Sequence, residues 1–100
     1  MAEKNKGENA KFSLIAISNA EKRYKLDKGQ YYDCASPCNI TKLNDDLGLL
    51  LGDRYFDYSI TGNTTFFEAT ATRKNEGMCA GGTIKVTSDD NTIVAGCNVW

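Results

Sequence analysis

The spacing of hydrophobic residues changes partway along the chain, from a helical period to an alternating one. Between about residue 8 and residue 28, apolar residues recur every three or four positions, as they do on one face of an α-helix. This face contains Leu14, Ile17, Ala20 and Tyr24. Phe12 and Ile15 lie beside it and widen the apolar arc in the N-terminal half. The pattern therefore predicts an amphipathic helix over residues 8–28.

The predicted helix has a clear end signal. Lys25 and Lys28 fall in its last turn, where positive charge favours the carbonyl end of the helix dipole, and Gly29 follows as a residue that tolerates a left-handed conformation. Glu21 stands four residues before Lys25, the favourable order for an ion pair on a helix surface. At 1.5 Å per residue the helix would be about 30 Å long.

Residues 29–53 predict a loop with one short helix. Ser36-Pro37 interrupts regular structure, and Thr41 is a candidate cap for a short helix that ends at Gly48. The apolar run Leu49–Leu51 is expected to pack against the core rather than to form a strand.

Residues 54–96 alternate apolar and polar side chains, which is typical of strands. "YFDYSITG" and "TTFFEATATRK" flank a turn at Gly62-Asn63 and predict one hairpin, with Phe67, Ala69 and Ala71 on one side. "GTIKVTSDDNTIVAG" predicts a second hairpin around an Asp-Asp-Asn turn. A helix followed by about four antiparallel strands indicates an α+β fold, with the helix on one face of the sheet. We expect one domain over residues 1–100.

Composition narrows the function classes. Twelve basic and thirteen acidic residues leave a net charge of −1, which does not favour a nucleic-acid partner. The chain has no histidine, the commonest general base and metal ligand. No apolar run is long enough to span a bilayer, and "MAEKNKGENA" lacks the apolar core of a signal peptide. We predict no enzymatic activity and no cofactor; the serines that lack a base partner are Ser13, Ser18 and Ser59.

Four cysteines in so small a chain predict two disulfides and an oxidising environment. Cys34 and Cys38 are close enough to close a small loop, but the spacing leaves all three pairings of Cys34, Cys38, Cys79 and Cys97 open. Zinc is the less favoured alternative, because Cys79 and Cys97 are not a close pair.

Other candidate sites have simpler structural interpretations. The acidic residues that could bind calcium are expected to serve turns, since a calcium site needs about six converging oxygens. These residues are Asp45, Asp46, Asp53, Asp89 and Asp90. Two glycosylation triplets begin at Asn39 and Asn63 and are expected by chance in a threonine-rich chain. The clustered aromatics are expected in the core, because no basic stripe accompanies them; they are Tyr31, Tyr32, Tyr55, Phe56 and Tyr58.

Three segments resemble the type IV pilins and the pseudopilins of type II secretion. "NAKFSLIAISNAEKRYKLDKGQYY" is similar to the second half of a pilin helix, with Ala20, Tyr24, Gly29 and Tyr31 at its typical positions. "LNDDLGLLLGDRYFDYSI" resembles the leucine-rich turn and aromatic strand that follow it. "FFEATATRKNEGMCAGGTIKV" resembles the strand, loop and cysteine before the last hairpin. The resemblance covers about residues 8–95.

The resemblance implies a filament subunit whose globular domain is seen here without its N-terminal segment. Family members begin with a basic leader and about 25 apolar residues, which this sequence lacks. Leu14, Ile17, Ala20 and Tyr24 would then cover the sheet, whereas Phe12 and Ile15 would face the filament core. The implied partners are further copies of the chain, the assembly machinery and the inner membrane. The implied location is an extracellular pilus, with a membrane pool before assembly.

The resemblance also favours one disulfide pairing. Many pilins close a C-terminal loop with a disulfide, which implies Cys79–Cys97 and leaves Cys34–Cys38; crossed pairings remain the alternative. The glycine-rich calcium loop of the major pseudopilin is not evident in "TSDDNT", which favours a pilin over a pseudopilin. A small secreted binding module is the alternative from a different functional class. For Phe12 and Ile15, the alternative to a filament-core face is that they are simply exposed positions in a frayed part of the helix.

Overall fold

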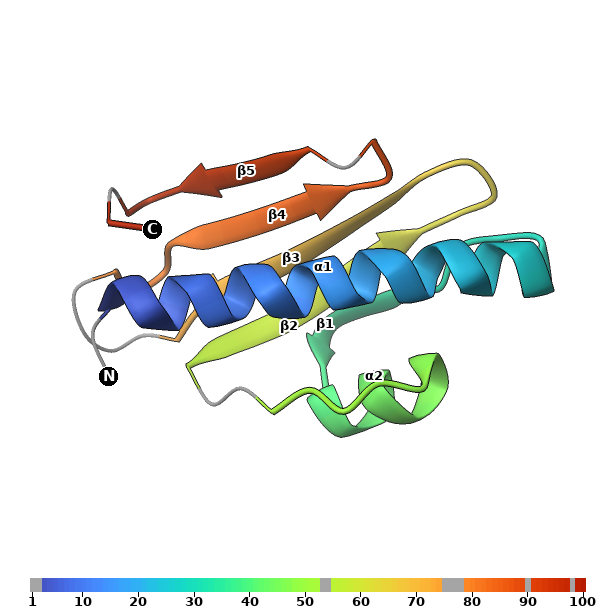
Figure 1. Ribbon diagram of the computed structural model, residues 1–100, viewed down its shortest axis with the longest axis horizontal. Coiled ribbons are helices and arrows are strands. Elements are labelled where there is room, and N and C mark those ends of the chain that lie inside the picture. The colour runs from blue at the N-terminus through green and yellow to red at the C-terminus, as the bar shows by residue number, and fades with distance from the viewer. Residues whose placement is uncertain (1–2, 53–54, 75–78, 90, 98) are drawn as a thin grey trace.

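The fold is one long helix laid across an antiparallel sheet, in a computed structural model that describes residues 3–52, 55–74, 79–89, 91–97 and 99–100 (Figure 1). Helix α1 spans Glu3–Lys28, and the short helix α2 spans Ile40–Leu47. The sheet has five strands in sequence order, so each strand pairs with its neighbour along the chain. They are β1 (Cys34–Cys38), β2 (Phe56–Gly62), β3 (Phe67–Arg73), β4 (Thr83–Thr87) and β5 (Thr92–Ala95). The predicted α+β fold is confirmed.

Strand β1 lies where the sequence predicted a loop. It pairs with β2 at Cys34↔Ile60 and Cys38↔Tyr58, and the register shifts between these two pairs. A proline within the strand removes one backbone donor, which an edge strand tolerates. The strand is too short and irregular to show an alternating pattern, which is why the sequence did not predict it. The sheet therefore has five strands instead of about four.

Helix α1 begins at Glu3, five residues before the predicted start. Residues 3–7 are polar and carry no apolar stripe, but Gly7 is buried there because the Trp100 indole packs on it. A Cβ atom at position 7 would lie 2.3 Å from Cδ1 of Trp100, so only glycine fits this contact. The helix ends as predicted, with Gly29 at φ 80° and its N–H bonded to the Lys25 carbonyl at 2.9 Å.

The core lies between α1 and the three middle strands. Alternate residues of β2, β3 and β4 point toward the helix, and they are all buried: Phe56, Tyr58, Ile60, Phe67, Ala69, Ala71, Ile84 and Val86. Pairing places Ala69 beside both Ile60 and Val86. The small side chains of β3 leave room for the helix, which contacts β3 and β4. Every residue of β5 is exposed by contrast, Ile93 included.

Helix α2 is capped by Asn39 rather than by Thr41. The Asn39 side chain accepts a hydrogen bond from the Thr41 N–H at 2.7 Å, and Gly48 ends the helix in a left-handed conformation. Leu49 and Leu51 pack against the core, as expected for the leucine run, but Leu50 is fully exposed.

The cap gives a direct stability prediction. Replacing Asn39 by alanine removes the acceptor for the Thr41 N–H, so we expect the free energy of unfolding to fall by about 1 kcal/mol. Replacing Thr41 by alanine leaves the cap in place and should change it by less than about 0.5 kcal/mol. Urea denaturation of both variants measures the difference, and equal effects would show that Asn39 does not act as the cap.

Candidate functional site

The inner face of α1 contains the residues predicted to cover the sheet. Leu14 and Ile17 are completely buried, and Ala20 is 3% exposed. Tyr24 is half-buried and meets the Tyr32 ring edge-on, with ring centroids 5.5 Å apart. These four residues all lie against the core, on the side of the helix that the spacing indicated.

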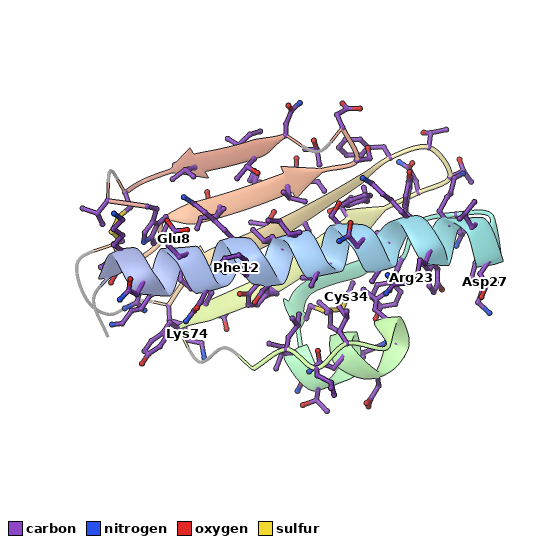
Figure 2. The ribbon with its side chains drawn as sticks, viewed as in Figure 1. Glu8, Phe12, Arg23, Asp27, Cys34 and Lys74 are labelled. Atoms are coloured by element: carbon purple, nitrogen blue, oxygen red, sulfur yellow. A yellow bond between two sulfur atoms is a disulfide. The ribbon has the colours of Figure 1, made fainter. Side chains whose placement is uncertain are left out.

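The outer face of α1 exposes apolar side chains to solvent. Phe12 is 69% exposed and Ile15 is 51% exposed. Leu26 is 89% exposed and follows Ile15 by eleven residues, or three helical turns, so it lies in the same row. Figure 2 shows Glu8, Phe12, Arg23 and Asp27 along this side of the helix. Sequence analysis missed Leu26, although its spacing from Ile15 was a usable signal.

A buried ion pair ties the N-terminal end of α1 to the sheet. Arg73 donates from Nε to the Glu3 carboxylate at 3.0 Å and from Nη1 to the Tyr55 carbonyl at 3.1 Å. The Trp100 indole N–H also donates to Glu3, at 3.3 Å. The bonds from Arg73 are the main reason that the pKa of Glu3 is lowered. Arg73 follows Ala69 and Ala71 in the series of alternate buried positions along β3. This spacing in the sequence could have predicted that Arg73 is buried.

Two disulfides lie at opposite edges of the sheet, one across β1 and one beside β4 and β5. Cys34 is bonded to Cys38 with Cα atoms 5.6 Å apart, and Cys79 to Cys97 with Cα atoms 5.4 Å apart. This is the preferred pairing, and it leaves no free cysteine. All four sulfur atoms are occupied, so the alternative of a zinc site built from thiolates does not fit the structure.

The disulfides predict resistance to thiol reagents. We expect the native protein to react with a maleimide only after reduction, when four thiols per chain become available. Mass spectrometry of labelled protein before and after reduction measures this. Four labelled cysteines in unreduced native protein would contradict both disulfides.

Glu21 does not form the predicted surface pair with Lys25. Its side chain is completely buried, and its Oε1 accepts a hydrogen bond from the Tyr32 N–H at 2.6 Å. Lys25 instead donates to the carbonyl oxygens of Gly29, at 3.3 Å, and of Thr64. Burial, opposed by the Tyr32 hydrogen bond and assisted by the charge of Asp33, raises the pKa of Glu21 to about 7.

The acidic candidates do not converge on a metal site. Asp46 accepts hydrogen bonds from the Tyr32 hydroxyl at 2.5 Å and from Lys42 at 2.6 Å, and the bond from Lys42 is the main reason that its pKa is lowered. Asp53 and Asp90 lie outside the described residues. Within the ranges that the structure describes, no three cysteine or acidic side chains are grouped as a metal would require. The same residues include no helix long and apolar enough to cross a membrane.

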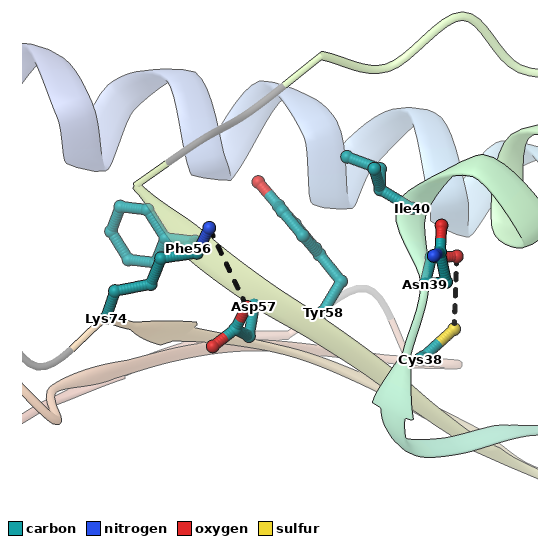
Figure 3. A pocket seen from close by; sticks show the side chains of 7 residues that line it. All are labelled: Cys38, Asn39, Ile40, Phe56, Asp57, Tyr58 and Lys74. Atoms are coloured by element: carbon teal, nitrogen blue, oxygen red, sulfur yellow. Dashed lines mark hydrogen bonds and ion pairs between the residues drawn. The ribbon is translucent and has the colours of Figure 1, made fainter.

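The hollow between α2 and β2 has a volume of about 400 Å³ (Figure 3). Its lining residues are Cys38, Asn39, Ile40, Phe56, Asp57, Tyr58 and Lys74. Its single carboxylate, on Asp57, lies 4.0 Å from the ammonium group of Lys74. A second hollow of about 440 Å³ lies between α1 and α2 and carries Arg23, Asp27, Lys28 and Asp46. Each lining therefore combines acidic and basic side chains.

Sequence comparison with known proteins finds no relative: no family model matches the chain, and no curated protein sequence matches it. Structural comparison gives a match in fold. The chain is similar to a type IV pilin from Shewanella oneidensis solved at high resolution, with a TM-score of 0.57 and 20% sequence identity. The match covers 95% of this chain and 96% of the pilin chain, so it includes the helix and the sheet together. The protein therefore has a type IV pilin-like fold.

Proposed function

We propose that this chain is the globular domain of a filament subunit that assembles through the outer face of α1. One observation carries the proposal: in a pilin-like fold, the helix exposes a row of large apolar side chains, Phe12, Ile15 and Leu26, on the side opposite the sheet. The inner face of the same helix already fills the core. The outer row lies outside the core cluster of the single domain and is available to a partner.

Burial of this row would favour association. A large apolar side chain gains about 1.5–3 kcal/mol when it is transferred fully from water to a packed interior. Phe12, Ile15 and Leu26 follow one side of α1. Figure 1 shows that this helix runs without a sharp kink, so it can pack along neighbouring helices. Helices from further copies of the chain supply matching rows, so each subunit buries its own row and those of its neighbours.

We further propose that an apolar segment of about 25 residues continues α1 at its N-terminus in the natural protein. This segment would hold the subunit in the inner membrane before assembly and pack in the filament afterwards. The partners are then other copies of the chain, the assembly machinery and the inner membrane, and the assembled product is an extracellular pilus. The role is structural, without catalysis.

The alternative within the same fold is a type II secretion pseudopilin. The turn segment "TSDDNT" between β4 and β5 contains no glycine, unlike the glycine-rich calcium loop typical of the major pseudopilin. This difference supports the pilus subunit.

Substitutions on the outer face test the proposal. In the full-length protein, Phe12→Asp combined with Ile15→Asp should abolish filaments, because two charges would have to enter the helix interface. Thr61→Asp, on an exposed position of β2, is the matched control and should leave filaments intact. Electron microscopy of sheared cell-surface material measures assembly. Normal filaments from the double variant would contradict the proposal.

The isolated domain provides the folding control. Phe12 and Ile15 are exposed in the isolated domain. Phe12→Asp and Ile15→Asp, each made singly, should therefore change its free energy of unfolding by less than about 0.5 kcal/mol. Loss of filaments with unchanged domain stability separates an assembly defect from a folding defect.

A further inference from the structure

Glu21 lies at the junction between the helix and the segment that follows it. Its Oε1 accepts a hydrogen bond of 2.6 Å from the N–H of Tyr32, which is eleven residues further along the chain. Tyr32 in turn places its ring against Tyr24 and donates its hydroxyl to Asp46 of α2 at 2.5 Å. One buried carboxyl group therefore connects α1, through a single residue, with α2 and the start of β1.

The second oxygen of Glu21 is in a different environment from the first. Oε2 is buried and makes no hydrogen bond to any described residue. A buried carboxylate with one donor is costly, because the ionised form loses its hydration without full replacement. A proton on Oε2 removes the charge while leaving Oε1 free to accept from Tyr32, so the neutral acid fits this site better than the carboxylate.

The charged groups near Glu21 reinforce this preference. Lys25, one turn further along α1, is directed to the carbonyl oxygens of Gly29 and Thr64, and its Nζ lies 5.6 Å from the centre of the Tyr31 ring. On the following segment, Asp33 adds negative charge, and its carboxylate accepts the Gly62 N–H at 2.9 Å. On α2, Lys42 is paired with Asp46 at the far end of the Tyr32 side chain. Lys25 and Lys42 are thus engaged with groups other than Glu21.

We propose that Glu21 is a pH-sensitive latch, which holds the Tyr31–Cys34 segment on α1 while it is protonated and loosens that segment when it loses its proton. The inference does not depend on the proposed filament role. Burial raises the pKa of Glu21 from 4.5 to about 7. Glu21 therefore binds its proton more tightly when the Tyr31–Cys34 segment covers it than when the segment has opened and Glu21 is in water. The latch is therefore strongest below pH 4.5, weakens progressively as pH rises toward 7, and is weakest above pH 7.

Amide hydrogen exchange of Tyr32 in the 100-residue protein tests the latch. After correction for the intrinsic exchange rate, protection of this amide should fall by roughly 100-fold between pH 5 and pH 8.5, because each pKa unit of preference is worth tenfold. In Glu21→Gln, which keeps an acceptor but cannot ionise, protection should not change with pH. Asp33→Asn keeps Glu21 and should retain most of the dependence. A fall of equal size in Glu21→Gln and in the unsubstituted protein would overturn the proposal.

A carbon-detected NMR titration of the Glu21 side chain gives a second readout that needs no variant. A midpoint near pH 7 supports the latch. A midpoint below pH 5 overturns it, because the carboxylate would then be stable in place and no loosening would follow its ionisation.

Discussion

Leu14→Asp is expected to unfold the domain under conditions where the unsubstituted protein is folded. Leu14 is completely buried in the cluster formed by α1 and the sheet. Its loss removes about 2–5 kcal/mol of packing, and the carboxylate adds the cost of an unpaired buried charge. The sum exceeds about 5 kcal/mol, which is comparable to the whole stability of a small domain.

The matched control is Ile15→Asp, one residue away on the outer face. Ile15 is 51% exposed, so this change should alter the free energy of unfolding by no more than about 0.5 kcal/mol. Thermal melting followed by circular dichroism compares the two variants. Near-normal melting of Leu14→Asp would show that the helix packs on the sheet through a different face.

Removal of the Cys79–Cys97 disulfide has the second largest expected effect. The two cysteines are 18 positions apart, and closing a loop of that length in the unfolded chain is worth about 3 kcal/mol. The bond also joins the segment before β4 to the segment after β5. Without it, the exposed edge strand β5 would no longer be linked covalently to the segment before β4. We expect the double serine variant to unfold at a much lower urea concentration.

The other disulfide provides the comparison. Cys34 and Cys38 are only four positions apart, so their bond constrains the unfolded chain less, by about 2 kcal/mol. Urea denaturation of the two double serine variants should therefore rank the Cys79–Cys97 pair as the more important. The reverse order would show that the loop length does not determine the contribution of these bonds.

Periodicity predicted the parts of the fold that have a regular buried face. Leu14, Ile17 and Ala20 repeat at helical spacing, and the alternation around Ala69 and Ala71 continues through the middle of the sheet. In both cases one side of the element is buried along its length, so apolar residues recur in the sequence at the period of that helix or strand. Strand β1 was missed because its register shifts between Cys34 and Cys38, so no regular alternation of buried residues marks it in the sequence.

The errors at single residues have a different cause. Glu21 and Arg73 are charged, and a charged residue is normally expected at the surface. Each has a tertiary partner that the local sequence does not reveal: Glu3 pairs with Arg73 from 70 positions away, and the Tyr32 N–H donates to one of the two carboxyl oxygens of Glu21. No local pattern encodes such distant partners. Leu26 is a different case, because its spacing from Ile15 already placed it on the outer face of α1.

The most direct measurement for the proposed filament role is the sequence of the natural gene upstream of the codon for Lys4. We predict a short basic leader followed by about 25 apolar residues that continue α1 in the same register as Phe12 and Ile15. An upstream region that encodes no apolar stretch, or only a secretory signal that is cleaved off completely, would contradict assembly through this helix.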